Sequence, residues 1–192
     1  MRPLFFFIVG VFAMSSASLA QPAMWDVDEM RSSLSFVFEQ EGESFKGDIE
    51  KFSSDIRFDV GDLAQSIAHI TIDLTSLSAG NAERDDALQS SDWFYLSKFP
   101  QAEFKTTELR QLGDRAFEAD AVLSIRGIEK KIVLPFTLDF EGEDVHMVGA
   151  LDMNRLDFGL GEGFWANPDF IGLSVIVRVE IFARRALSNA DG

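Results

Sequence analysis

The sequence has no cysteine and only two histidines, and both shortages exclude classes of chemistry. Without cysteine there is no disulfide, no thiolate metal ligand and no lipid-modified cysteine at a processing site. A catalytic zinc site usually takes three protein ligands, whereas His69 and His146 stand alone on the polar parity of two expected strands. No HExxH, GxSxG or EF-hand motif occurs, and Gly159, Gly161 and Gly163 form GxGxG without the spacing of a dinucleotide site. We therefore expect no metal, no catalytic residue and no enzymatic activity.

Positive charge is also scarce. Seventeen Lys and Arg face thirty-two Asp and Glu, for a formal net charge of −15. Nucleic acid and anionic membrane surfaces would be repelled, so neither is expected as a stable partner. The charges are interspersed along the chain, which is typical of a folded domain and not of a charged disordered tail.

Long apolar runs are missing except for Leu4 to Met14. That run follows the positive charge of Arg2 and precedes the small residues of Ser15 to Ala20, the order of a secretory signal. Eleven residues of helix span only about 16 Å, which is about half of a bilayer core. We expect a signal peptide at 1–20 that is cleaved after Ala20, a single mature domain at 21–192, and a periplasmic location.

The rest of the chain is dominated by apolar residues at alternating positions, the pattern of half-buried strands. Short turns such as Glu41-Gly42-Glu43 and Glu141-Gly142-Glu143 separate the alternating segments. The pattern predicts an all-β protein, an antiparallel barrel of about eight strands, with a sandwich as the alternative. The alternation is clearest over 34–39, 45–50, 55–59, 68–75, 117–125, 131–140, 145–153 and 173–182. One segment breaks it, and there Asn81 is suited to cap a short helix over 82–89.

The inward parity mixes phenylalanines with small residues. Small barrels either fill their interior with side chains or hold one small ligand. The small residues Gly47, Ala68, Ala119, Ala121 and Gly149 would interdigitate with the phenylalanines in a solid core, or they would leave a tube. The pattern alone favours neither.

The sequence resembles the YceI-like family of lipocalin-like, polyisoprenoid-binding proteins over nearly all of the mature chain. The stretches that carry the resemblance are Trp25-Asp26-Val27-Asp28, Ile72 to Leu77, Asp92-Trp93-Phe94, Phe99-Pro100, Leu123 to Ile128, Leu134-Pro135-Phe136 and Asp157-Phe158-Gly159. Arg31 and Ala87 stand where many members carry histidine, so any role tied to those histidines does not transfer. The segment from Gly159 to Gly172 is similar to members associated with cytochrome b561-type membrane proteins.

The resemblance implies a periplasmic carrier that holds an isoprenoid quinone or a polyprenyl lipid in the barrel interior and needs no other cofactor. The inward residues expected to contact the lipid are Phe36, Phe38, Phe45, Ile70, Ile72, Leu74, Leu123, Ile125, Phe136, Leu138 and Val177. The candidates for the mouth and the head group are Arg84, Arg126, Arg155 and Trp165.

A diphosphate head would need several clustered cations, which the net charge opposes, so a neutral head such as a quinone is favoured. The expected partners are the apolar lipid and a cytochrome b561-type membrane protein. The alternative is an acidic interaction module or stress protein, with a filled core and no lipid, that binds a partner through Trp165 and the helical insert.

Overall fold

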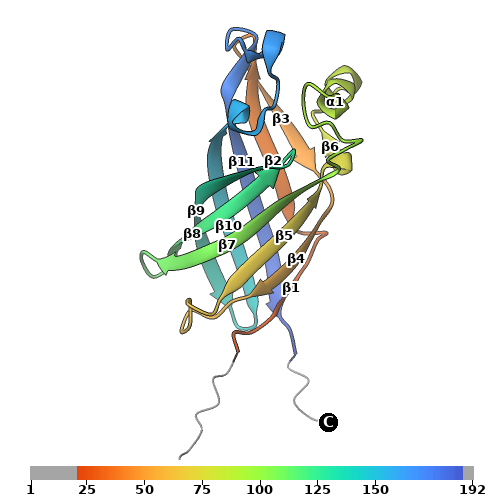
Figure 1. The fold of residues 1–192 in the computed structure, drawn as a ribbon. Coiled ribbons are helices and arrows are strands. Elements are labelled where there is room, and N and C mark those ends of the chain that lie inside the picture. The colour runs from red at the N-terminus through yellow and green to blue at the C-terminus, as the bar shows by residue number, and fades with distance from the viewer. Residues whose placement is uncertain (1–20, 188–192) are drawn as a thin grey trace, which may run out of the picture.

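The computed structural model describes residues 21–187, which form eleven strands, one α-helix and three short 3₁₀-helices (Figure 1). In chain order they are β1 (Trp25–Val27), β2 (Ser33–Gln40), β3 (Glu43–Ile49), β4 (Phe52–Arg57), β5 (Ile67–Asp73), η1 (Leu74–Ser76), β6 (Leu77–Ser78), α1 (Ala82–Gln89), β7 (Gln101–Gln111), β8 (Ala116–Ile125), β9 (Ile128–Glu141), β10 (Asp144–Asn154), η2 (Arg155–Phe158), η3 (Gly163–Ala166) and β11 (Ile171–Arg185).

All eleven strands belong to one strongly curled antiparallel sheet, in the order β4-β5-β7-β8-β9-β10-β11-β2-β3-β6, with β1 paired to β11. The curl brings the β4 edge back toward β1, where Met24 forms an isolated bridge with Arg57. The ladder starts at β4 and ends at β6, so the sheet is a half-barrel and not a ring of paired strands. The expectation of an antiparallel all-β fold is confirmed, but the strand number of about eight was too low.

The extra strands are the short β1 and β6 and the long β7, whose alternation is interrupted. Ala102, Phe104 and Thr106 share one parity in β7, and the register with β8 then shifts between Thr106 and Glu108. Because of this shift, the odd-numbered Leu109 lies on the inner face together with the even-numbered Ala102, Phe104 and Thr106. A bulge adds one residue to a strand and reverses the parity beyond it, which explains why period two alone did not reveal β7.

The expected short helix is confirmed at Ala82–Gln89. The Asn81 side chain accepts hydrogen bonds from the backbone N–H of Glu83 at 2.9 Å and of Arg84 at 3.3 Å. It thereby satisfies two donors that a helix N-terminus leaves without intrahelical partners. The helix buries none of its residues and lies at one end of the molecule, near η2 and η3, while β1 lies at the opposite end (Figure 1).

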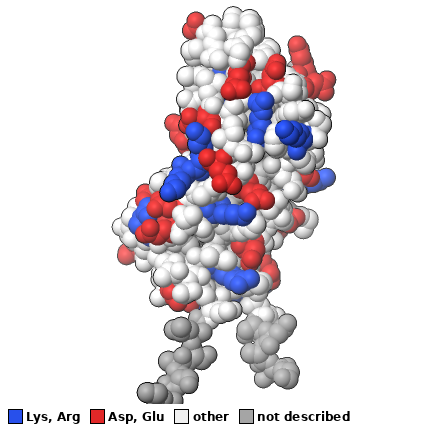
Figure 2. Space-filling model, in the orientation of Figure 1, with Lys and Arg blue, Asp and Glu red and all other residues white. Residues whose placement is uncertain are grey.

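The outer face carries acidic and basic side chains close together (Figure 2). Arg110, for example, lies between Glu118 and Asp120 on the neighbouring strand. This mixing agrees with the interspersed charges of the sequence. Within residues 21–187 no helix is long and apolar enough to cross a membrane.

Candidate ligand-binding cavity

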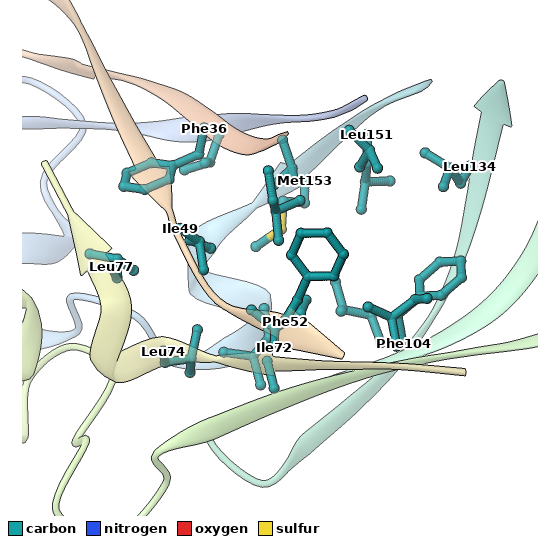
Figure 3. Close-up of a pocket in the computed structure, with 18 of the residues that line it drawn as sticks. Phe36, Ile49, Phe52, Ile72, Leu74, Leu77, Phe104, Leu134, Leu151 and Met153 are labelled. Atoms are coloured by element: carbon teal, nitrogen blue, oxygen red, sulfur yellow. The ribbon is translucent and has the colours of Figure 1, made fainter. Parts of the chain in front are cut away.

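The curled sheet encloses a cavity of about 470 Å³. Each of the eleven strands contributes at least one lining side chain, and nearly all of them are aliphatic or aromatic. In the close-up, side chains from β2, β3, β4, β5, β7, β9 and β10 point into a common space, with the sulfur of Met153 among carbons (Figure 3). The volume lies within the range of small-molecule sites, roughly 300–1,000 Å³. The interior is therefore hollow and apolar, and the sheet is not filled by its own side chains.

Ten of the eleven residues expected in the interior line this cavity: Phe36, Phe38, Ile70, Ile72, Leu74, Leu123, Ile125, Phe136, Leu138 and Val177. Their contact with a lipid stays a prediction. Phe45 was placed wrongly, since it is not part of the lining. Its ring packs 5.8 Å from that of Phe38, its partner in β2, and lies 4.3 Å below the guanidinium of Arg84. These two side chains cover Phe45 at the end of the molecule near α1.

The small residues on the inner parity have different effects. Ala68 and Ala119 line the cavity and leave room in it. At Gly47 the space is occupied, because a Cβ there would come within 2.1 Å of the Phe36 ring. A Cβ at Gly149 would likewise lie 3.2 Å from Phe136. Both of the sequence interpretations, interdigitation and an open tube, thus apply to different positions.

Many further lining residues were not proposed as site residues, although most of them share the inward parity of their strands. Trp25, Phe52 and Phe104 were overlooked because β1 is short, β4 begins at Phe52 and β7 was not recognised. The further lining residues include Trp25, Leu34, Ile49, Phe52, Ile56, Phe58, Trp93, Phe94, Phe104, Leu109, Leu134, Phe140, Met147, Leu151, Met153, Leu160 and Ile171.

The polar lining is concentrated near α1. Asn81, Glu83 and Arg84 come from the first turn of the helix and its cap, and Gln40 comes from the end of β2. Deeper in the wall, the Thr106 hydroxyl binds the backbone of Ala68, accepting from its N–H at 2.8 Å. The cavity therefore has one polar end and an apolar interior, which suits an amphiphile with a small head and a long tail.

Arg155 lines the cavity but does not offer its guanidinium to a ligand. It is 1% exposed, and its five N–H groups donate to five backbone carbonyl oxygens, of Leu160, Gly161, Trp165, Ile171 and Gly172, at 2.5–2.9 Å. Arginine has five donors in all, so none is left for a head group. Burial lowers the pKa of this guanidinium from its usual value. The expected head-group role is therefore wrong, and Arg155 instead fastens the loop at the cavity mouth.

Arg126 also has a structural position and does not line the cavity. It lies in the two-residue turn between β8 and β9, where Arg126 and Gly127 have φ of +53° and +74°, as hairpin turns of this length require. Its guanidinium donates to the carbonyl oxygens of Gly159 and Ser91. Arg126 thus ties the η2 loop to the segment after α1, and its expected head-group role is wrong as well.

Arg84 and Trp165 both line the cavity, and their role at the mouth and the head group stays a prediction. The Arg84 Nε donates to the Ala79 carbonyl at 3.3 Å, and within residues 21–187 its two terminal nitrogens have no hydrogen-bond partner. Trp165 lies 6.3 Å from Trp93, which also lines the cavity. Arg84 is therefore the cation of the mouth that can still donate to a ligand.

Ionisable residues do not gather into a metal site. In the described part of the chain no group of three or more His, Asp or Glu is arranged to hold a metal ion. His146 stacks on Phe182 at 4.2 Å and lies 2.9 Å from Glu180 on the outer face, and His69 lies 3.9 Å from Glu103. The two histidines are thus both part of the partly exposed surface.

Comparison with known proteins agrees with this geometry. The YceI-like domain matches residues 25–183. A UPF0312 protein of Vibrio parahaemolyticus is 30% identical over 154 residues, which cover 73% of this chain and 79% of the relative. Among solved structures, BcnA of Burkholderia cenocepacia superposes with a TM-score of 0.79 at 28% identity, covering 82% of this chain and 99% of BcnA. A polyisoprenoid binding domain from Saccharophagus degradans has a TM-score of 0.69 at 16% identity, covering 85% and 99%.

Proposed function

Since the chain belongs to the YceI-like domain family, we propose that it is an exported carrier that holds one apolar isoprenoid-type lipid in its cavity. The observation that supports this is the cavity itself, about 470 Å³ of apolar space with a polar end beside α1. The structural neighbour from Saccharophagus degradans is a polyisoprenoid binding domain, and a prenyl tail suits a wall of aliphatic and aromatic side chains. The hollow interior also counts against the alternative, an interaction module, because that alternative requires a filled core.

The energetics favour exchange with a membrane over permanent storage. Each methylene that leaves water for an apolar site gains about 0.8 kcal/mol, so a tail of several isoprene units gains on the order of 10–20 kcal/mol. A bilayer interior offers the same gain. The net free energy of transfer from membrane to cavity is then close to zero, and the lipid loads and unloads reversibly.

A neutral head group fits the mouth better than a diphosphate. Within the described part of the chain the terminal nitrogens of Arg84 have no partner, but Glu83 lines the cavity beside it, and Arg126 and Arg155 donate to backbone carbonyls. A diphosphate would need several converging cations. A quinone needs only hydrogen-bond donors for its two carbonyl oxygens, which Arg84 and the amides of Gln40 and Asn81 supply.

The test is organic extraction of the purified native protein followed by mass spectrometry. The matched pair of variants is Ile72→Trp, which projects an indole into the cavity, and Val133→Trp, at a site on β9 that is 46% exposed. We expect an isoprenoid lipid from the parent and from the Val133 variant, and much less from the Ile72 variant. A parent that contains no apolar lipid and takes up no ubiquinone from vesicles would refute the proposal.

Export is part of the same proposal, because a carrier of membrane lipids needs access to a membrane surface. Residues 1–20, which contain the expected signal, lie outside the described residues. Intact-mass measurement of periplasmic material should show a chain that begins at Gln21, and a retained Met1 would refute cleavage after Ala20. The cytochrome b561-type partner stays a prediction, which co-purification from solubilised membranes would test.

A further inference from the structure

The cavity ends in a thin aromatic wall at the end of the molecule opposite α1. Trp25, Phe58 and Phe140 line the main cavity there, and the same three residues line a second cavity of about 150 Å³. Asp59, Val60, Gly142, Glu143 and Arg185 complete the smaller cavity. A single layer of three side chains therefore separates the apolar interior from a partly polar space beside β1 and the end of β11.

Two of the three rings are held firmly. The Trp25 indole N–H donates to the Phe58 carbonyl at 2.9 Å, and Trp25 is only 8% exposed. The Phe58 ring meets Phe117 edge to face at 5.8 Å, and Phe117 is 2% exposed and stacks on Phe136. Moving either ring would break a hydrogen bond or disturb a packed aromatic cluster.

Phe140 is held more loosely. Its ring lies 6.0 Å from that of Trp25, and the residue is 44% exposed although it lines the cavity. It stands next to the last residue of β9, beside the turn at Gly142, where φ is +66°. Its cross-strand partner Val145 also lines the cavity, so Phe140 belongs to the inner face. The ring has space behind it in the 150 Å³ cavity.

We propose that Phe140 is the stop that sets the length of prenyl tail the cavity accepts. This rests on the proposed function and adds a chain-length preference to it. With the head group at Arg84, a tail that just reaches Phe140 is wholly buried. A longer tail has to push the ring into the smaller cavity or leave methylenes in water at the mouth, and each methylene left in water forgoes the roughly fourfold gain in affinity that its burial would bring. Without the ring, the two cavities merge and longer tails fit.

The experiment measures affinity for ubiquinone homologues of increasing tail length, because quinones quench tryptophan fluorescence. All three tryptophans of the chain, Trp25, Trp93 and Trp165, line the cavity. The variant is Phe140→Ala, and the matched control is Phe170→Ala, which removes a 37% exposed ring at the mouth end that does not line the cavity.

For the parent we expect affinity to rise with tail length and then to level off or fall at a break. In Phe140→Ala the break should move to longer tails. The affinity of this variant should exceed that of the parent about tenfold or more for tails beyond the parent's break, and less than twofold for shorter tails. Phe170→Ala should keep the parent's dependence of affinity on tail length. Phe140→Trp, which enlarges the ring, should move the break to shorter tails. Circular dichroism confirms that each variant is folded.

The possible failures are distinguishable. If Phe140→Ala keeps the parent's length profile, or gains equally for all homologues, Phe140 is not the stop, while the carrier function stands. If no homologue quenches the fluorescence of the parent or of any variant, the carrier function fails and the stop fails with it.

Discussion

Replacing Arg155 with methionine tests how the cavity mouth is built. The guanidinium is 1% exposed and donates to five carbonyl oxygens between Leu160 and Gly172. Methionine keeps much of the apolar volume of the side chain but supplies no donor. The five carbonyls then stay buried without partners, or the loop opens to hydrate them and loses its packing.

The size of the effect follows from those five bonds. A buried carbonyl that loses its partner costs about 1–3 kcal/mol. Opening of the loop lets water bind some of the carbonyls, which limits the summed cost, and removal of the buried charge recovers part of its desolvation cost. We therefore expect the free energy of unfolding to fall by about 3–5 kcal/mol. For a domain of this size that corresponds to a fall in Tm of roughly 6–20 °C. Arg155→Lys keeps the charge but has three donors, so it should lose roughly half as much.

Urea unfolding followed by circular dichroism measures this loss as a lower midpoint with an unchanged slope. The control is Arg115→Met, because Arg115 has a 67% exposed side chain and pairs with Asp139 at 2.7 Å. Such a surface pair is worth about 0–1 kcal/mol. If the free energy of unfolding of Arg155→Met lies within about 1 kcal/mol of the parent's, Arg155 does not hold the five carbonyls as the structure indicates, and its assignment to the mouth loop is wrong.

Three further predictions concern other parts of the molecule. Leu123 and Ile72 both line the cavity, but Leu123 is 6% exposed at the centre of a packed cluster, whereas Ile72 is only partly buried at its edge. Leu123→Trp should therefore cost about 1–3 kcal/mol by overpacking, and Ile72→Trp should cost less; thermal melts of the two variants decide this. Asn81→Ala should remove about 1 kcal/mol of helix stability; because α1 buries no residue, hydrogen exchange over 82–89 should rise while Tm barely changes, and a global loss would contradict the capping assignment. Hydrogen bonds from Arg184 hold the pKa of Asp144 below its usual value. The stabilisation that this lowered pKa gives the folded state is present above the unfolded-state pKa of Asp144 and is lost as pH falls through its folded-state pKa. Asp144→Asn should therefore lose less stability than the parent between roughly pH 5 and pH 2. Equal losses of unfolding free energy in low-salt urea titrations would show that the Asp144–Arg184 pair does not contribute to stability.

The sequence determined the local elements and most of the inner face. Alternation over segments such as Ala116–Ile125 identified strands and their buried parity, because side chains of a strand point alternately to its two faces. Asn81 identified the start of α1, because a helix cap depends only on the next three residues. The same parity placed ten of the eleven proposed interior residues at the cavity.

Only the tertiary structure decided whether the interior was hollow, how many strands formed the sheet and what the arginines do. Whether Gly47 leaves open space in the interior depends on Phe36 in the neighbouring strand, whose ring fills the space that a side chain at Gly47 would take. The register shift in β7 arises from pairing with β8 and hides the parity of Leu109. Arg84, Arg126 and Arg155 are alike in sequence. Within residues 21–187, the terminal nitrogens of Arg84 alone among the three have no hydrogen-bond partner, because the fold brings loop carbonyls to the other two side chains. Parity is a property of one strand, whereas volume and hydrogen-bond satisfaction depend on side chains and carbonyls from several segments at once.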